Sequence, residues 1–144
     1  MADKVVKVLG RQDDSNRMEV TAREHVFVID QPPAAGGQDA GPTPLEYLLG
    51  SLAGCMGAIG HIVALQRKLP VRGMQVEVEG TLDLDGLLGR PTESRVGFKQ
   101  FLIKVQVDAD LSLEEKRAFI AEVERRCPVS ENLGHTTPIE FQVS

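Results

Sequence analysis

The chain has 144 residues and a mass of 15.7 kDa, enough for one domain with its own hydrophobic core. Hydrophobic residues make up 42% and charged residues 26%, an ordinary globular composition that argues against a disordered chain. The net charge is −5, and no basic stretch is long enough to follow a phosphate backbone, which argues against nucleic acid as a partner. We therefore expect a single domain spanning residues 1–144.

The N-terminal residues are charged from Asp3 onward and lack the apolar stretch of a secretory signal, which favours a cytoplasmic location. The two cysteines, Cys55 and Cys127, form no CxxC motif, and the three histidines are scattered, so we expect no metal site. No glycine-rich phosphate-binding motif is present, and no cofactor is expected. The ordinary role of a free cysteine is that of a small buried hydrophobic residue.

The first third of the chain has the alternation of strands. Residues 3–9 and 17–30 are expected to be extended. Within the second of these segments Met18, Val20, Val26 and Val28 recur at even spacing, and residues 23–25 are typical of a turn between two strands. Residues 31–43 are rich in Pro, Gly and Ala, which predicts a loop.

A long helix is predicted from Thr43 to Pro70. Thr43, Pro44 and Glu46 stand in the order of a capping box, and Pro70 ends the pattern. About 25 residues give a helix of roughly 37 Å, the width of a whole domain of this size. Apolar residues recur along it at spacings of three and four: Leu45, Leu48, Leu49, Leu52, Cys55, Met56, Ile59 and Ile62 or Val63.

This helix has no charged residue from Tyr47 to Gln66, so a transmembrane segment must be considered. Its many glycines and the strand patterns on both sides favour instead a soluble helix buried on nearly all faces. Small residues repeat at spacing four, which would let another backbone approach closely, such as the same helix of a second chain. These pairs are Gly50 and Gly54, Ala53 and Gly57, and Gly60 and Ala64.

The second half of the chain predicts a hairpin. Residues 72–84 and 94–107 alternate as strands, with a turn at residues 85–92 between them, and they would pair in an antiparallel manner. The class is therefore α+β.

A charged helix is predicted next, from the capping box of Ser112 and Glu115 to about Arg126, with Cys127-Pro128 ending it. Its polar positions, Glu122 among them, are interpreted as a solvated face. A short turn or helix then ends at residues 132–134, and residues 138–143 read as a terminal strand.

Two segments carry a resemblance to a known family. Residues 41–46 (GPTPLE), followed by residues 52–55 (LAGC) on one helix, and residues 127–130 (CPVS) after a charged helix resemble the osmotically inducible protein C (OsmC) family. The order of the expected elements agrees with that family over essentially the whole chain. The resemblance implies an OsmC-like fold, with antiparallel sheets around a long central helix, in an intertwined homodimer whose active sites lie at the subunit interface.

The resemblance also implies a function. It indicates a thiol-dependent peroxidase that reduces organic hydroperoxides in oxidative stress defence, with Cys55 as the reactive and Cys127 as the resolving cysteine. In the organic hydroperoxide resistance (Ohr) branch the reductant is a dihydrolipoyl group, so a lipoylated protein would be the dithiol partner. The alternative is a non-catalytic OsmC-like module that binds an apolar small molecule at the dimer interface.

Two further site residues follow from the same resemblance. The branch places a Glu directly after the Pro of the first motif, where this chain has Leu45, so Glu46 is the candidate, with helix capping as its other role. For the Arg that holds the thiolate, Arg17 is the best positional candidate, and Arg11 and Arg23 are rivals.

Peroxide is attacked by a thiolate, and at a pKa near 8.5 only about 3% of a cysteine is ionised at pH 7. Burial of Cys55 in the middle of a helix should raise its pKa, so it needs a cation supplied by the tertiary structure. Cys127, followed by Pro128, is placed as a helix N-cap, where a thiolate is favoured. Local sequence thus nominates Cys127 as the more acidic thiol, whereas the resemblance assigns the attack to Cys55, and we follow the resemblance.

A Cys–His hydrolase, with His61 as base to Cys55, is a third hypothesis. Six positions on a helix separate the two side chains by about 120°, which is poor geometry for a nucleophile and its base.

Overall fold

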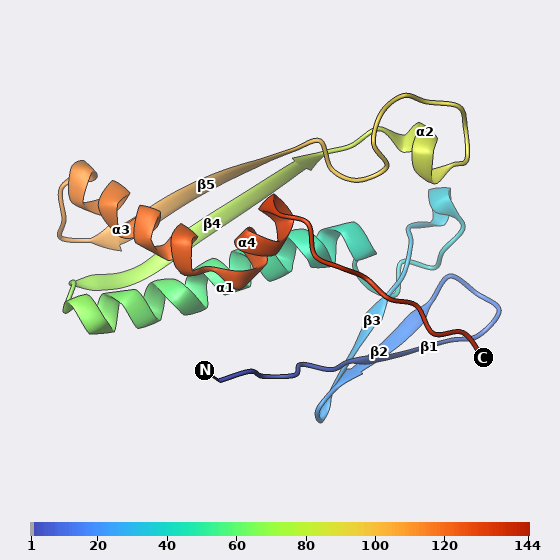
Figure 1. Cartoon of the computed structure of the whole chain (residues 1–144), viewed down its shortest axis with the longest axis horizontal. Coiled ribbons are helices and arrows are strands. Elements are labelled where there is room, and N and C mark those ends of the chain that lie inside the picture. The colour runs from blue at the N-terminus through green and yellow to red at the C-terminus, as the bar shows by residue number, and fades with distance from the viewer. Residues whose placement is uncertain (1) are drawn as a thin grey trace. The chain divides into compact units, whose positions relative to one another are not determined.

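The computed structural model describes residues 2–144, which form two compact parts, one up to Leu48 and one from Leu49 to Ser144. Each part is described by itself. The elements are α+β with antiparallel pairing throughout (Figure 1). In chain order they are β1 (Leu9–Gln12), β2 (Met18–Ala22), β3 (His25–Ile29), a 3-10 turn (Pro33–Ala35), α1 (Pro44–Arg67), β4 (Val71–Thr81), α2 (Leu84–Leu87), β5 (Gln100–Ala109), α3 (Leu113–Arg126) and α4 (Pro128–Gly134).

The first part contains a three-stranded antiparallel sheet in the order β1-β2-β3. The predicted turn is confirmed at residues 23 and 24, where Arg23 has a left-handed backbone with a φ of 56°. The first strand was expected at residues 3–9 and begins only at Leu9. β1 pairs with β2 from Leu9 opposite Thr21 to Gln12 opposite Met18. Residues 3–8 therefore extend beyond the paired part of β2 and are not part of the sheet.

The loop after β3 is organised by a buried carboxylate. Asp30 accepts hydrogen bonds from the backbone N–H groups of Gln31 (2.8 Å), Gln38 (3.2 Å) and Ala40 (3.0 Å). These bonds hold the pKa of Asp30 below its usual range, because they favour the charged form. Gly37 fits this fold of the chain because a Cβ there would collide with the carbonyl of Gln31. The predicted loop at residues 31–43 is thus an ordered structure.

Helix α1 starts as the capping box predicts. Glu46 donates its N–H to Thr43 Oγ1 (3.2 Å), and Thr43 donates its N–H to Glu46 Oε2 (2.9 Å). The helix ends at Arg67, before the predicted stop at Pro70, because Lys68 takes a left-handed conformation with a φ of 55°. The Leu69 N–H then donates a hydrogen bond to the carbonyl of Ala64 (2.9 Å), which caps the C-terminal end of the helix.

In the second part, β4 and β5 form the predicted long antiparallel hairpin, from Val71 opposite Ala109 to Thr81 opposite Gln100. The second strand starts at Gln100 instead of residue 94, and a short helix, α2, occupies part of the predicted turn. The segment before β5 contributes to packing instead of strand pairing. Phe98 is buried there and packs on Gly80, where a Cβ would lie 2.5 Å from the Phe98 ring.

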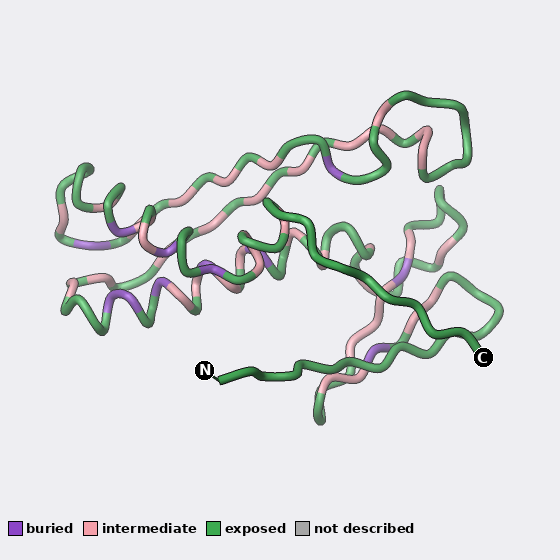
Figure 2. Tube along the Cα trace, viewed as in Figure 1, coloured by how far each residue is buried: buried purple, intermediate pink, exposed green. Residues whose placement is uncertain are grey.

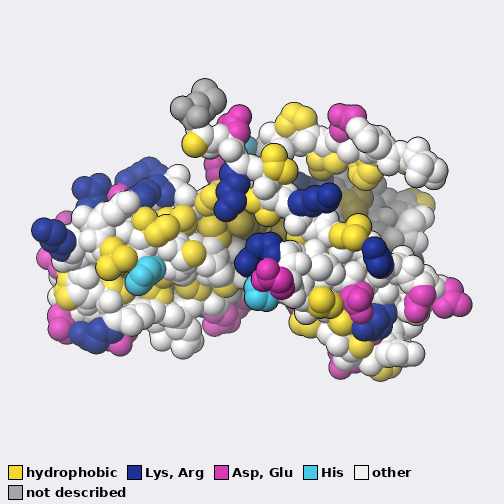
Figure 3. Space-filling model, turned by 90° about the horizontal axis from the view of Figure 1, so that it is seen from below, with side chains coloured by type: hydrophobic (Ala, Val, Ile, Leu, Met, Phe, Trp, Pro, Cys, Tyr) yellow, Lys and Arg dark blue, Asp and Glu magenta, His cyan; other side chains and the backbone are white. Residues whose placement is uncertain are grey.

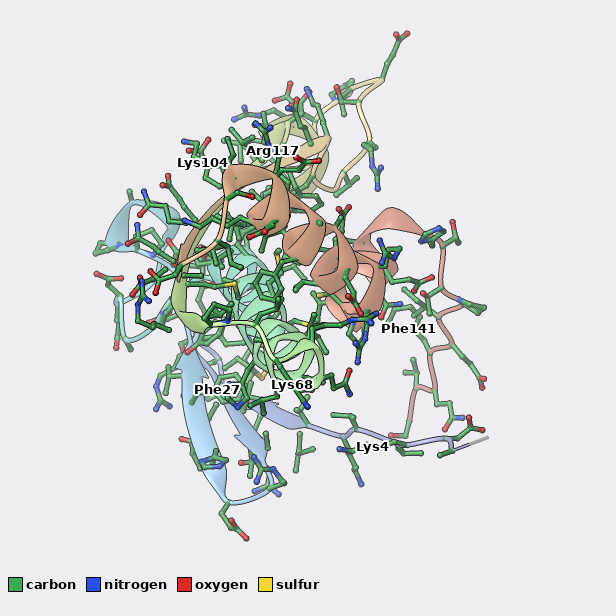
Figure 4. The ribbon with its side chains drawn as sticks, turned by 90° about the vertical axis from the view of Figure 1, so that its left-hand side faces the viewer. Lys4, Phe27, Lys68, Lys104, Arg117 and Phe141 are labelled. Atoms are coloured by element: carbon green, nitrogen blue, oxygen red, sulfur yellow. The ribbon has the colours of Figure 1, made fainter. Side chains whose placement is uncertain are left out.

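The core of the second part lies between α1, the hairpin and α3. Figure 1 shows α1 running along the hairpin with α3 and α4 beside it, and Figure 4 looks along α1 from the end near Lys68. The buried cluster consists of Leu52, Met56, Val63, Ala64, Phe119, Val123 and Cys127, with apolar residues of the hairpin packed around it.

The expectation that the long helix is buried on nearly all faces is wrong for a single chain. Figure 2 shows buried positions recurring at intervals along α1, separated by exposed ones. A Cβ at Gly60 would press on Met74, whereas a Cβ at Gly50, Gly54 or Gly57 would meet no atom within 4 Å. Among the described residues, α1 is also the one helix with the length and hydropathy to cross a membrane, a test that core helices of soluble proteins pass as well.

The predicted strand at residues 138–143 is also wrong for a single chain, since this segment has no strand in the structure. Strand structure needs a neighbour to supply hydrogen bonds, and the strand pairs of residues 2–144 do not include this segment. Its apolar side chains are left in solvent, Ile139 at 78%, Phe141 at 85% and Val143 at 92% exposure.

Candidate active site

The two cysteines meet inside the second part of the chain. The Sγ of Cys127 donates a hydrogen bond to the Sγ of Cys55 over 2.8 Å. Cys55 comes from the middle of α1 and is partly buried, while Cys127 lies between α3 and α4 and is fully buried. Both thiols are free in this structure. Their sulfur atoms are placed for proton exchange with each other and, after oxidation of one, for bond formation.

The position of Cys127 follows from local sequence. The capping box of Ser112 and Glu115 starts α3 as predicted, and the helix runs to Arg126. Cys127 has an extended backbone that ends α3 and begins α4, with Pro128 as the first residue of the new helix. The predicted N-cap is confirmed, because the Cys127 Sγ accepts the N–H of Ser130 over 3.4 Å.

Burial raises the pKa of the Cys55 thiol, and the hydrogen bond from Cys127 raises it further. A hydrogen bond from the backbone N–H of Val129 acts in the opposite direction. Among the described residues, none of the groups that shift this pKa is a cation. Within the second part of the chain, burial therefore favours the thiol form of Cys55, and none of the groups that shift its pKa supplies the cation that the sequence analysis called for.

Glu46, the predicted acid, lies in the first turn of α1 and is exposed. Its carboxylate accepts the N–H of Thr43, so the structure displays the capping role. Nine positions on a helix amount to two and a half turns, so its side chain leaves α1 on the side opposite to Cys55. A catalytic role for Glu46 stays a prediction.

The three candidate arginines all lie in the first part. Arg17 precedes β2 and forms an ion pair with Glu19 over 3.5 Å. Arg11 is an exposed residue of β1, and Arg23 occupies the left-handed position in the turn between β2 and β3. The role of Arg17 toward the thiolate stays a prediction.

His61 does not share the surroundings of the thiols. It lies on the exposed side of α1 and lines an open groove together with Gly57, Ala64 and residues of β4, and Cys55 does not line that groove. The Cys–His hydrolase hypothesis therefore has no matching geometry. Within residues 2–144, no three His, Cys, Asp or Glu side chains gather as a metal site.

One residue near the site was misjudged from sequence. Glu122 was interpreted as part of a solvated face, but it is largely buried and binds Arg67 of α1 and Arg126 of α3. The signal in the sequence was the spacing of four between Glu122 and Arg126, which places them on one helix face. The bond to Arg67 joins residues 55 positions apart, which no local pattern reveals.

The sequence of the chain is similar to those of known proteins. The family model described as OsmC-like protein matches residues 36–142 of the chain. A hydroperoxide reductase of Mycoplasma pneumoniae is 21% identical over 142 residues, covering 99% of this chain and 96% of that protein.

Solved structures agree in fold. The OsmC-like protein of Mycoplasma pneumoniae superposes with a TM-score of 0.80 at 22% identity, covering 92% of this chain and 89% of that chain. An organic hydroperoxide resistance protein OsmC of Legionella pneumophila gives a TM-score of 0.69 at 19% identity, covering 92% and 91%. At these identities the likeness establishes the fold, α+β with antiparallel sheets and a long helix.

Proposed function

Because the chain belongs to the OsmC-like protein family, we propose that it is a thiol-dependent peroxidase that reduces organic hydroperoxides through a cycle of Cys55 and Cys127. The observation that carries this proposal is the 2.8 Å between the two sulfur atoms. Two cysteines with purely structural roles have no need to meet, whereas a resolving cysteine must reach the sulfur it condenses with. A relative named for hydroperoxide reduction supports the same reaction class.

The cycle has three steps. The Cys55 thiolate attacks the terminal oxygen of the hydroperoxide, the O–O bond breaks, and an alcohol leaves after taking up a proton, with Cys55 oxidised to a sulfenic acid. The Cys127 sulfur then attacks the Cys55 sulfur, which forms the disulfide and releases water. An external dithiol reduces this disulfide by thiol exchange and is itself oxidised, which returns both thiols.

The surroundings of the pair favour an apolar substrate. Cys55 packs into a cluster that includes Met56, Phe119 and Val123, so a bulky organic peroxide gains contacts that hydrogen peroxide cannot make. Ionisation of Cys55 requires a cation beyond the groups that now shift its pKa, and Arg17, ahead of Arg11 and Arg23, is our proposed source. Glu46 is the proposed acid of the site.

Two partners are proposed, a second copy of the chain and a dithiol reductant. The open side of α1 around Gly50, Gly54 and Gly57 suits the helix of a second copy, as an intertwined homodimer requires. A dithiol, such as the dihydrolipoyl group of a lipoylated protein, is the proposed reductant, and the cytoplasm is the proposed location.

A second candidate function is supported by one observation. Burial keeps the pKa of Cys55 high, so the chain by itself holds an unreactive thiol in an apolar setting. A non-catalytic module that binds an apolar small molecule would have no need of an acidic thiol.

A turnover assay separates these two candidates. We expect the protein to consume cumene hydroperoxide with dihydrolipoamide at least about tenfold faster than hydrogen peroxide, because buried apolar groups contribute on the order of 1.5–3 kcal/mol each. One equivalent of peroxide should remove two hydrogens per chain by intact mass, and dithiol should restore them.

Single substitutions test the assigned roles. Cys55→Ser should abolish peroxide consumption, and Cys127→Ser should still react once and leave a sulfenic acid that dimedone traps. The double serine variant is the control for loss of packing alone. No mass change in the wild-type protein, together with tight binding of an apolar probe, would favour the binding module.

A further inference from the structure

A cluster of charged side chains joins the C-terminal turns of α1 and α3. Arg67 donates from Nε and Nη2 to the two carboxylate oxygens of Glu122, over 3.2 and 3.1 Å. Arg126 donates from Nη1 to the same carboxylate over 3.3 Å and to Gln66 Oε1 over 2.9 Å. We refer to Gln66, Arg67, Glu122 and Arg126 as the Glu122 clamp.

The clamp differs from an ordinary surface ion pair. The Glu122 side chain is only 16% exposed, although that of Arg67 is 63% exposed. Its two-pronged contact fixes the direction as well as the distance of the bond. By contrast, the pair of Arg72 and Asp108 on the hairpin is exposed on both sides, at 53% and 63%, and pairs of that kind contribute little to stability.

The clamp lies next to the resolving cysteine in the chain. Arg126 is the last residue of α3, and Cys127 follows it directly. On α3, Glu122 and Arg126 share one face, and Val123 lies on the adjacent face that is buried against α1. Cys127, directly after the helix, belongs to the same buried cluster as Val123. A rotation of α3 about its axis that moved Cys127 away from Cys55 would therefore also break the bonds to Arg67 and Gln66.

We propose that Glu122 is a positioning residue, whose clamp holds Cys127 against Cys55 and thereby favours closure of the disulfide. The use of this device in the cell rests on the proposed peroxidase cycle. The proposed effect of Glu122 on disulfide formation does not depend on that cycle, because disulfide closure can be measured without peroxide. Oxidised glutathione converts the dithiol into the protein disulfide through a mixed disulfide, and two molecules of reduced glutathione carry away the two electrons.

The test measures this equilibrium on the full chain in glutathione buffers of varied ratio, with alkylation of remaining thiols and intact mass as the readout. For Glu122→Gln we expect the equilibrium constant for disulfide formation to fall about three- to tenfold, the effect of losing a shielded two-pronged ion pair. A residue that merely stabilised the fold would affect the oxidised and reduced forms alike and leave this constant unchanged. The matched control is Asp108→Asn, which removes the exposed pair with Arg72 and should not change the constant.

Two variants on the exposed partner keep the test informative if Glu122→Gln does not fold. Arg67→Gln should reproduce the loss, and Arg67→Lys, which keeps one charged donor, should recover part of it. Constants equal to wild type in both Glu122→Gln and Arg67→Gln would overturn the proposal, and so would a wild-type protein that forms no disulfide at any glutathione ratio. A protein that closes its disulfide but consumes no peroxide would refute the proposed peroxidase and leave the clamp to be judged by the constants.

Discussion

The chemistry of the two thiols is decided by residues on separate helices. Cys55 alone is a buried thiol whose pKa is raised, and Cys127 alone is a helix N-cap. Their meeting turns these ordinary roles into a pair in which either sulfur has the other within bonding reach after small movements. The cation that would make Cys55 reactive is the remaining requirement, and its supply determines whether this member of the family is a peroxidase.

Asp30 is a second residue whose surroundings define its effect. Its lowered pKa means that its stabilising contribution is present above the unfolded pKa, about 3.9, and is lost as the pH falls through the lower folded pKa. Asp30→Asn should therefore lower the melting temperature by several degrees at pH 7, since it removes the charged acceptor of three N–H groups. The difference from wild type should shrink below about pH 4.

Thermal unfolding at several pH values checks this prediction. Asp39→Asn is the matched control, because Asp39 lies in the same loop but is exposed. A difference between wild type and Asp30→Asn that stayed constant from pH 7 to pH 3 would show that the charge of Asp30 is not what stabilises the loop.

At the scale of elements, α1 has two sides that use glycine differently. The space beside the Cα of Gly60 is filled by the side chain of Met74 from β4, so the absence of a side chain at Gly60 allows close packing within the chain. Gly50, Gly54 and Gly57 face open space, and glycine in a helix costs about 1 kcal/mol against alanine. We therefore expect these three glycines to serve the proposed contact with a second copy of the chain.

Gly60→Leu should therefore destabilise the fold by about 1–3 kcal/mol, because the added side chain overpacks a filled site against Met74. Gly60→Ala should lie close to wild type, since its better helix propensity offsets a small shift of the flexible Met74 tip. Urea unfolding measures both. A Gly60→Leu protein as stable as wild type would mean that β4 is not packed on α1 at this position.

At the scale of the whole molecule, apolar surface remains to be covered. Ile62 and Leu65 of α1 and the side chains of the C-terminal segment are exposed, and Figure 3 shows hydrophobic side chains reaching the surface. Alternating apolar residues at 138–143 form a strand only when a neighbour is present. Both features suit a protein that is completed by a second copy.

We expect light scattering after size exclusion to give twice the 15.7 kDa of one chain at micromolar concentration. Gly54→Leu should shift this species toward the monomer, because a bulky side chain prevents close approach of a second helix, while leaving the fold of one chain intact. Circular dichroism is the control for the fold. A wild-type protein that runs as a monomer, or a Gly54→Leu dimer as tight as wild type, would contradict the homodimer.

Local sequence alone determined the elements whose signals lie within a few residues. The capping boxes of Thr43 and Ser112, the turn at Arg23, the alternation of β4 and β5 and the N-cap at Cys127 are all short-range patterns, and the structure confirms each. The motifs around Cys55 and Cys127 also indicated the family, because their residue types and order are specific.

Only the tertiary structure decided what depends on partners far apart in the chain. The strand expected at residues 138–143 lacks a neighbour, the long helix is covered on one side, and Glu122 is a largely shielded ion-pair partner and not part of a solvated face. The contact between Cys55 and Cys127 belongs here as well, since the resemblance implied it but no local pattern required it. Burial, pairing and pKa are set by what packs against a residue, and packing joins residues that the linear sequence keeps apart.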